Sequence, residues 1–420
     1  MSKVIDKLKK DFFASCPTGL EELLLKEVES LKTSSVKLVK GGVHFTSEPI
    51  VAMEFIIITR IASRLYKKAY QFEIKIEKDL YFYAKEIKWK ALFNLDQSFK
   101  INVVQSKSNN GEKRSKFKST MFLAQNLKDG IVDKFRDDCD GERPSIDKEN
   151  PDMTILMHIE PNDNPHSVKE NVTILIDMSG KPLSQRGYRD TNFSAPLKEN
   201  LAAGLVLLSG YTGKENFIDP MCGSGTIIIE SLLIKGNIPP SYLTLDDITQ
   251  YPEESHWDFM RHNWYLKDTY LVDDFKKLVE KYIEVARDGF ELLEKSTVPT
   301  IARDIEKYGF NATKFNLAAA DLTEFVDLGI DDATTMSLPA IDSGILVTNP
   351  PYGERIGEED LLPNLYFNFG ENLKQNFKGF KAYIFTGNLA LIKKISLRTS
   401  KKVILYNGSI ESRLVEYDLF

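Results

Sequence analysis

The sequence predicts an α/β protein in which a parallel sheet forms the C-terminal part and an α+β module precedes it. Three observations carry this prediction. The strand-like NFID runs directly into the glycine turn PMCGSGT and the apolar helix IIIESLLIK, which is how an α/β unit begins. The alternation of strand and helix resumes at VPTIARDIEKYGFNATKFN. The residues before about 180 mix helices and strands without that regular alternation.

The N-terminal elements follow from hydrophobic periodicity. A strand at Phe12-Phe13-Ala14 precedes the helix LEELLLKEVESLK and the β-type segment VKLVKGGVHF, which Gly41-Gly42 interrupts. We then predict a second helix, AMEFIIITRIASRLYKKAY, over residues 52–70, followed by the alternating FEIKIEK. The next module holds the helices DLYFYAKEI and STMFLAQNLKDGIVDKF and the strands FKINVV, TILMHIE and VTILIDMS, with CDGERPSIDKENPD as a loop.

A domain boundary is predicted near GKPLSQRGYRDTNFSAP, because this stretch holds turn residues and bases with little periodicity. Beyond it, the helix PLKENLAAGLVLLSG leads to the glycine turn. Residues 236–296 interrupt the α/β part with a polar, aromatic and helical insertion. Its stretch HWDFMRHNWY is expected to be a helix-packing seam, with a cover over a pocket or an RNA contact as the alternatives.

Composition narrows the classes of protein. The 420 residues carry a net charge of −6, and no apolar run approaches the roughly 18 residues of a membrane span. The charged start MSKVIDKLKKDFF is unlike a signal peptide. The three cysteines lie far apart and form no metal-ligand spacing with histidine, which argues against disulfides and structural zinc. We therefore expect a cytoplasmic protein without a metal, a membrane association or an obligate protein partner.

One basic segment stands out against the acidic whole. Between Lys100 and Lys118 the single acid is Glu112, and the bases include Lys107, Lys113, Arg114, Lys116 and Lys118. Taken alone, this segment is a solvated loop. It becomes a candidate nucleic-acid contact if an enzyme acting on nucleic acid is indicated elsewhere.

The first chemical motif is Asp219-Pro220-Met221-Cys222-Gly223-Ser224-Gly225-Thr226. Glycines between a strand and a helix let the backbone approach a ligand, and the helix N-terminus supplies free N–H donors. The motif lacks the GK[ST] of a P-loop and the third glycine of the dinucleotide fingerprint. A nucleoside with a zwitterionic tail therefore fits better than a pyrophosphate. Asp304, with Ile305 beside it and Glu306 as the fallback, follows the next apolar strand, where an acid can bind ribose hydroxyls.

The second motif is Asn349-Pro350-Pro351-Tyr352, which ends the apolar run Ile345-Leu346-Val347-Thr348. Two prolines cannot extend a sheet and hold the turn stiffly. The exocyclic amine of a nucleobase is a poor nucleophile, and two fixed acceptors on its N–H groups bias it toward attack. The Asn349 side-chain oxygen and the Pro350 carbonyl are such acceptors, and Tyr352 can stack on an unpaired base. With a sulfonium methyl as electrophile, positioning would supply most of the catalysis.

DPMCGSGT together with NPPYGER resembles the class I S-adenosylmethionine (SAM)-dependent RNA methyltransferases that carry a THUMP domain. The chain is most similar to the catalytic half of the bacterial 23S rRNA guanine-N2 methyltransferases. FASCPTGLEELLLKEV, RIASRLY, GKPLSQRGYR, APLKENLAA and LYNGSIESRL resemble family stretches as well. The resemblance implies a Rossmann-like methyltransferase domain at 183–420, a ferredoxin-like segment at 1–71 and an RNA-binding THUMP domain at 72–182.

The resemblance also implies roles for particular residues. Asp219 and the turn from Met221 to Thr226 would hold SAM, Asp304 its ribose, and Pro196 would approach it from the preceding helix. Asp332 would meet the adenine amino group, with Asp331 and the weaker rival Asp321 as alternatives. Arg355 would lie near the RNA or in a structural ion pair. TIARDIEKY lacks the glycine and Asp-Pro that often surround the ribose-binding acid. We expect no counterpart of the second methyltransferase domain that some relatives carry.

The resemblance implies SAM-dependent methylation of guanine N2 in RNA, with 23S ribosomal RNA as the expected substrate. Methylation of tRNA at guanine N2 stays open, as does adenine-N6 methylation of DNA or RNA, because the NPPY motif suits any planar amine, including a protein glutamine amide. A non-catalytic RNA-binding scaffold is the alternative from another class, although the intact Asn349 to Tyr352 motif speaks against it. A nicotinamide-dependent oxidoreductase is disfavoured by the missing third glycine.

Overall fold

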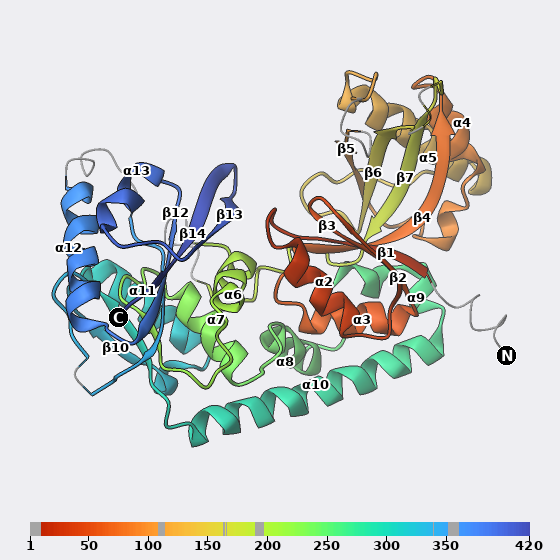
Figure 1. Ribbon diagram of the computed structural model, residues 1–420. Helices are drawn as coiled ribbons and strands as arrows, with labels where there is room; N and C mark the ends of the chain where they lie inside the picture. The colour runs from red at the N-terminus through yellow and green to blue at the C-terminus, as the bar shows by residue number, and fades with distance from the viewer. Residues whose placement is uncertain are drawn as a thin grey trace.

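Two seven-stranded sheets organise the molecule, one in each half of the chain (Figure 1). The computed structural model describes residues 10–107, 114–162, 164, 166–189, 197–338, 340–351 and 361–420. The predicted α/β class is confirmed, with an α+β N-terminal half and a largely parallel C-terminal sheet.

The N-terminal sheet has the strand order β2-β3-β1-β4-β7-β6-β5. Its strands are β1 (Lys10–Ser15), β2 (Ser34–Val39), β3 (Gly42–Ser47), β4 (Arg64–Ile74), β5 (Phe99–Gln105), β6 (Met153–Pro161) and β7 (Glu170–Asp177). The strand β4 pairs with β1 through residues 64–67 and with β7 through residues 66–74. Because β4 runs through residues 71 and 72, the ferredoxin-like and THUMP parts share one continuous strand.

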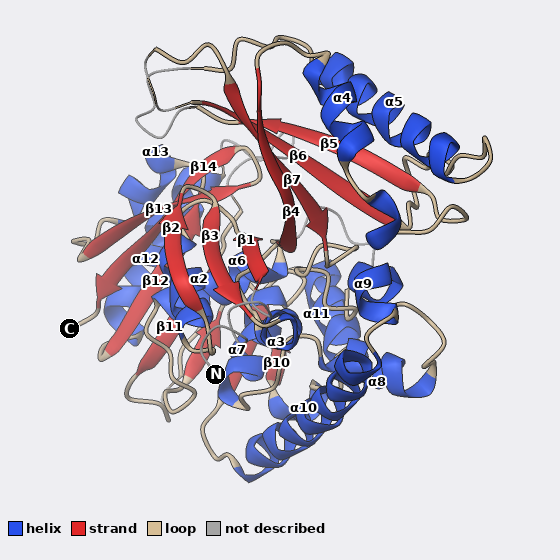
Figure 2. Ribbon diagram, turned by 90° about the vertical axis from the view of Figure 1, so that its right-hand side faces the viewer, coloured by secondary structure: helices blue, strands red, loops and turns tan. Residues whose placement is uncertain are grey.

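Four helices cover one face of this sheet: α2 (Glu21–Glu29), α3 (Pro49–Ile58), α4 (Asp79–Glu86) and α5 (Thr120–Asp138). Figure 2 shows α4 and α5 lying together on one side of the strands β4 to β7. Their apolar residues form a core of their own with the inward side chains of β6 and β7. Alternate residues along each strand point to opposite faces, so the other face presents a separate set of side chains.

The helix predicted over residues 52–70 is wrong in its second half. The helix α3 ends at Ile58, and the chain continues as β4 from Arg64. The carboxylate of Glu27 accepts hydrogen bonds from the Thr59 hydroxyl at 2.6 Å and from the Arg60 N–H at 2.8 Å. The Arg60 N–H is thus bonded to Glu27 and not to a helical carbonyl, so the helix does not continue, and periodicity alone does not reveal such tertiary contacts.

The C-terminal sheet has the strand order β10-β9-β8-β11-β12-β14-β13. Its strands are β8 (Phe217–Asp219), β9 (Thr300–Asp304), β10 (Asp327–Ile330), β11 (Gly344–Thr348), β12 (Phe380–Thr386), β13 (Lys401–Asn407) and β14 (Ile410–Asp418). The five strands from β8 to β12 are parallel, and β14 is antiparallel to both of its neighbours. The helices of this domain are α6 (Glu199–Leu208), α7 (Thr226–Lys235), α11 (Lys307–Ala319), α12 (Leu362–Asn376) and α13 (Leu389–Ile392).

The insertion after α7 is helical, with α8 (Tyr242–Gln250), α9 (Asn263–Leu266) and the long α10 (Thr269–Lys295). Figure 1 shows α10 running beneath both halves of the molecule. The buried rings of Phe259, Tyr265 and Phe275 meet edge to face, and Trp257 stacks on Phe259, which confirms the predicted helix-packing seam. Within the described ranges, no helix combines the length and the apolar character that crossing a membrane requires.

The insertion also fastens the THUMP part. The side chain of Asn263 donates hydrogen bonds to the Lys90 carbonyl and to Asn94 Oδ1, both at 2.8 Å, and its backbone N–H donates to the Leu92 carbonyl at 3.0 Å. The THUMP part is thus bonded to the insertion as well as through the strand β4.

The ferredoxin-like segment and the methyltransferase domain share one hydrophobic core, which runs from α2 and α3 through α6 and α7 to the C-terminal sheet. The loop after β1 illustrates the close fit. A Cβ atom added at Gly19 would lie 2.5 Å from the carbonyl oxygen of Ile404 on β13. The two parts therefore form a single packed unit, whereas the THUMP part keeps its own core.

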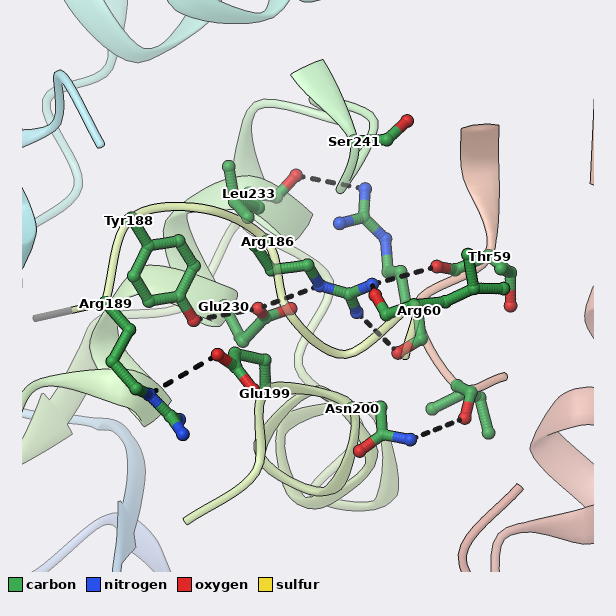
Figure 3. Close-up of polar contacts among 12 residues, drawn as sticks. Thr59, Arg60, Arg186, Tyr188, Arg189, Glu199, Asn200, Glu230, Leu233 and Ser241 are labelled. Atoms are coloured by element: carbon green, nitrogen blue, oxygen red, sulfur yellow. Dashed lines mark hydrogen bonds and ion pairs between the residues drawn. The ribbon is translucent and has the colours of Figure 1, made fainter. Parts of the chain in front are cut away.

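A buried polar cluster centred on Arg186 joins the same two parts (Figure 3). The guanidinium donates hydrogen bonds to the carbonyls of Thr59 and Arg60, at 3.4 and 2.7 Å, and pairs with Glu230 on α7 at 3.5 Å. Arg60 in turn donates to the carbonyl of Leu233 at 3.1 Å. The Arg186 and Glu230 side chains are 3% and 0% exposed. The helix that follows the glycine turn is therefore tied to the N-terminal segment by buried charge.

Candidate active site

The candidate site lies where the order of the C-terminal sheet reverses. The chain leaves β8 toward β9 on one side, whereas β11 lies on the other side of β8. Both pairings are parallel, so the carboxyl ends of the three strands meet at one edge. Asp219 ends β8, Asp304 ends β9, and Asn349 directly follows β11. Open α/β sheets bind ligands at such a reversal point.

The glycine turn has the backbone shape that its composition predicts. Gly223 and Gly225 have φ values of +54° and +76°, which L side chains rarely adopt. A Cβ at Gly225 would lie 2.8 Å from Cγ2 of Thr313, whereas a Cβ at Gly223 would meet nothing within 4 Å. Gly225 is thus needed for packing against α11. The side of the turn at Gly223 is open.

Two residues of α11, which we did not single out as binding residues, hold this turn from the neighbouring unit. The Thr313 hydroxyl donates to the carbonyl of Gly223 and the Asn316 side-chain amide to that of Ser224, each at 2.8 Å. The two side chains are three residues apart and so share one face of the helix. That spacing is the signal in NATKFN that could have identified them.

The other side chains of the turn have different surroundings. Cys222 is buried, with its Sγ 3.4 Å from the Thr313 hydroxyl, and burial raises the pKa of its thiol. Thr226 is buried at the start of α7, and its hydroxyl lies 3.2 Å from that of Ser224. Met221 is half-buried, and its backbone N–H donates to Asp219 Oδ1 at 3.2 Å.

The two acids of the site are held by backbone donors. Asp304 accepts the N–H of Gly223 on one oxygen and that of Glu306 on the other, both at 2.8 Å. Burial raises the pKa of Asp304, and these hydrogen bonds counteract the rise. Burial also raises the pKa of Asp219 to about 7, against the lowering effect of the nearby Thr348 hydroxyl and of the hydrogen bond from the Met221 N–H. Asp219 can therefore change its charge near neutral pH.

The end of β11 presents an acceptor to the same edge. Oδ1 of Asn349 is buried and has no hydrogen-bond partner among the residues that the structure describes. Pro350 is buried, and the carbonyl of Pro351 accepts a hydrogen bond from the Tyr366 hydroxyl at 3.2 Å. Tyr366, on α12, also lies 3.3 Å from the Thr386 hydroxyl at the end of β12. Sequence reasoning missed Tyr366 because nothing local connects α12 with the proline pair.

The three acids considered for the adenine amino group, Asp332, Asp331 and Asp321, lie at different places around β10. Asp332 lies at the carboxyl edge, where its Oδ1 accepts hydrogen bonds from the backbone and the hydroxyl of Thr334 at 2.8 and 2.7 Å. Asp331 lies beside it, with its N–H 3.3 Å from the Asp304 carbonyl. Asp321 follows α11 before β10 and so lies at the opposite edge of the sheet, away from the site. The structure thus removes Asp321 as a rival.

Ile305 directly follows Asp304 and is 59% exposed. An exposed apolar side chain beside the acid gives a flat ligand group a surface to lie on.

The predicted RNA contacts lie in the other half of the molecule. Lys107 follows β5, and Arg114, Lys116 and Lys118 precede α5, all in the THUMP part. Lys107, Arg114, Lys116 and Lys118 are all exposed, and Lys116 donates a hydrogen bond to the carbonyl of Val168. The predictions made for Lys113, Pro196, Tyr352 and Arg355 fall outside the described residues.

Comparison with known proteins agrees with this organisation. Residues 11–66 match the RlmL ferredoxin-like domain, residues 75–163 the THUMP domain, and residues 186–416 the RMKL-like methyltransferase domain. Among curated relatives, the ribosomal RNA large subunit methyltransferase K/L of Syntrophotalea carbinolica is 33% identical over 418 residues, 97% of this chain and 53% of the relative. That of Desulfotalea psychrophila is 32% identical over 413 residues, 96% of this chain and 52% of the relative. The chain spans about half the length of these relatives.

Two solved structures share the fold over nearly the whole chain. A possible methylase from Clostridium difficile 630 has a TM-score of 0.79 at 25% identity, with 98% of both chains covered. SMU.472, crystallised with SAH, has a TM-score of 0.77 at 23% identity, again with 98% of both chains covered.

The sheet order, the glycine turn at its reversal point and the family match define a class I SAM-dependent methyltransferase. More narrowly, the chain belongs to the RMKL-like methyltransferase domain family, and it carries the ferredoxin-like and THUMP parts in front of that domain. The resemblance drawn from the sequence motifs is thereby confirmed.

Proposed function

We propose that this protein transfers a methyl group from SAM to the exocyclic N2 of a guanine in RNA, with large-subunit ribosomal RNA as the substrate. The proposal rests on one observation: the Oδ1 atom of Asn349 is buried and has no hydrogen-bond partner among the described residues. A buried acceptor without a partner among the described residues is costly unless a ligand supplies the missing donor. The N–H groups of an amino-substituted base are donors of the required kind.

The residues at the reversal point fit SAM. The open side of the turn at Gly223 leaves space for a ligand against the backbone, and the carboxylate of Asp304 has lone pairs left for ribose hydroxyls. Ile305 offers an apolar surface to the adenine, with Asp332 near it as an acceptor. Asp219 and the N-terminus of α7 would face the amino acid tail. SAM supplies an electrophilic methyl group on a sulfonium.

The chain's own contribution is to hold the amine. Asn349 and the Pro350 carbonyl accept the N–H groups, so that the nitrogen presents its lone pair. The proline pair and the Tyr366 hydroxyl keep these acceptors in place before the substrate arrives. Tyr352, which follows directly in sequence, would stack on the base. Pre-organised acceptors of this kind need neither a metal nor a covalent intermediate.

RNA is favoured as substrate by the THUMP part and by the basic residues around β5 and α5. The relatives named as ribosomal RNA large subunit methyltransferases support ribosomal RNA in particular. We assign the guanine N2 position from the similarity of the motifs DPMCGSGT and NPPYGER to the guanine-N2 branch of the family.

The test is methyl transfer from labelled SAM by the purified protein to total RNA from a strain that lacks it. The RNA is separated by size and digested to nucleosides, and the labelled nucleoside is identified by chromatography. Label in N2-methylguanosine from large-subunit ribosomal RNA is the expected result. Label in tRNA, or in N6-methyladenosine, would replace the proposed substrate or the proposed base. SAM binding without any labelled RNA would overturn RNA methylation itself.

A further inference from the structure

A row of rings crosses the face of the N-terminal sheet that lies opposite α2 to α5. Strand pairing aligns Lys37 on β2, His44 on β3, Phe13 on β1 and Tyr66 on β4 side by side. We call the three rings, together with Lys37 at one end, the aromatic row. The Phe13 ring lies 4.6 Å from that of His44 and 6.3 Å from that of Tyr66, and the Phe13 and Tyr66 planes differ by 17°. The rings therefore form a continuous surface across three neighbouring strands.

The row is open to solvent along part of its length. Lys37 and His44 are exposed, and Phe13 and Tyr66 are half-buried. The neighbours of Phe13 in the chain, Phe12 and Ala14, point to the opposite face and are 1% and 0% exposed. Rings on the solvent side of a sheet give up the stabilisation that burial would provide. They are therefore available to a partner with flat apolar groups.

The electrostatics of the row suit a polyanion with aromatic groups. Desolvation, and after it the charge of His158, lowers the pKa of His44 to about 4, so its ring is neutral and able to stack at pH 7. Lys37 brings a positive charge to one end of the row. Two acids on this face are paired: Asp11 lies 4.0 Å from Lys68 and accepts a hydrogen bond from Thr46. Asp177, opposite Tyr66 on β7, is buried and forms an ion pair with Arg64.

The row is also connected to the basic segment of the THUMP part. His158, on β6, is among the groups that lower the pKa of His44. The His158 ring in turn lies 2.7 Å from the hydroxyl of Ser106, the residue before Lys107. The contact between His158 and Ser106 therefore connects β6 with the start of the basic segment at Lys107.

We propose that this face binds a single-stranded segment of the substrate RNA, with unpaired bases stacking on Phe13, His44 and Tyr66 and Lys37 next to the phosphates. The inference rests on the proposed RNA substrate and adds where the RNA is held. Unpaired bases have a π-face irrespective of sequence, and sheets that recognise single-stranded RNA use aromatic side chains in this way. The face would therefore hold RNA without selecting a sequence, while the base is chosen at Asn349.

The test compares the affinities of variants of the full chain for a fluorescein-labelled single-stranded 12-nucleotide RNA, measured by anisotropy. Phe13→Leu and Tyr66→Leu keep an apolar side chain on the strand and remove the ring. Each is expected to weaken binding about tenfold, the loss of one stacked base. Lys37→Gln is expected to lower the slope of log K against log salt by about 0.7. Should Phe13→Leu not fold, the exposed His44→Leu carries the same test.

The matched control is Phe82→Leu, which removes a ring that is 56% exposed on α4, on the helix-covered side of the sheet. This variant should bind the RNA like the parent protein. Ring variants that bind normally, while the parent protein methylates RNA, would overturn the inference and leave the proposed function standing. Equal competition by a fully paired duplex would also overturn it, because stacking needs unpaired bases. A parent protein that neither binds nor methylates RNA would remove both proposals.

Discussion

The carboxylate of Asp304 accepts a hydrogen bond of 2.8 Å from the backbone N–H of Gly223 and thereby joins the end of β9 to the turn after β8. Its second oxygen holds the N–H of Glu306. Gly309 makes room for this arrangement, because a Cβ there would lie 2.6 Å from Cγ of Asp304. Asp304 therefore shapes the glycine turn, in addition to the ligand-binding role proposed for it.

Replacing Asp304 should affect both stability and SAM binding. Asp304→Ala leaves the N–H groups of Gly223 and Glu306 without their acceptor. We expect the free energy of unfolding to fall by about 2–4 kcal/mol and SAM to bind much more weakly. Asp304→Asn keeps one acceptor oxygen and should lose less of each. Urea unfolding and calorimetric titration with SAM measure the two effects. Lys307→Gln, at an exposed position nearby, is the control. Unchanged stability in Asp304→Ala would show that the turn does not depend on this carboxylate.

Asn349→Ala should abolish methyl transfer and leave SAM affinity nearly intact, because the side-chain oxygen is assigned to the substrate amine. Asn349→Asp keeps an acceptor oxygen on a side chain of the same shape and should retain more activity. Single-turnover transfer and SAM titration on the same preparations separate the two properties. Equal loss of both in Asn349→Ala would mean that the residue mainly holds the structure of the site.

Tyr366→Phe tests the support of the proline pair. The change removes the hydroxyl that donates to the Pro351 carbonyl at 3.2 Å and keeps the buried ring. We expect kcat to fall about tenfold, with the SAM dissociation constant unchanged, because the acceptors are held less firmly. Tyr383→Phe, another largely buried tyrosine on β12, is the matched control. A fall in SAM affinity without a fall in kcat would contradict this role.

SAM affinity should rise with pH through neutrality. The pKa of Asp219 is raised to about 7 in the free protein, chiefly by burial, so the carboxyl is largely protonated below that pH. A cationic ligand favours the ionised carboxylate and lowers this pKa, so SAM binding below pH 7 releases a proton. The SAM affinity therefore increases with pH until Asp219 is ionised in the free protein. Titrations from pH 5.5 to 8.5 test this. Asp219→Asn removes the carboxyl and reports the ligand's own titration. The same pH dependence in that variant would exclude Asp219 as the source.

The buried pair that joins the two halves can be tested through stability. Arg186→Met removes the cation beside Glu230 and the donor to the Thr59 and Arg60 carbonyls, and should cost about 3–5 kcal/mol of unfolding free energy. Adding Glu230→Leu removes the unpaired charge and should recover a large part of that loss. Urea unfolding of both variants measures the difference. A double variant that is no more stable than Arg186→Met would show that the charge on Glu230 is not the cause.

The parts of the fold that the sequence predicts are those with local causes. A turn with a left-handed backbone favours glycine, so Gly223 and Gly225 indicate the turn. The alternation after Asp304 continues an α/β unit, so the place of the turn in the sheet could be inferred as well. The end of α3 depends on Glu27, which is 32 residues away from Thr59 in the chain. The role of Tyr366 depends on how α12 packs against the end of β11. Contacts of this kind come from tertiary packing, which periodicity and motifs do not report.

The strand β4 has one more consequence. It belongs to both parts of the N-terminal sheet, and Asn263 bonds the THUMP part to the insertion. The aromatic row and Asn349 therefore belong to one connected structure. If RNA binds at the aromatic row, the fold of the protein fixes the distance between that binding surface and Asn349. The modified nucleotide would then be the one that the folded RNA brings to the far end of that span, and adjustments in reach would have to come from the RNA.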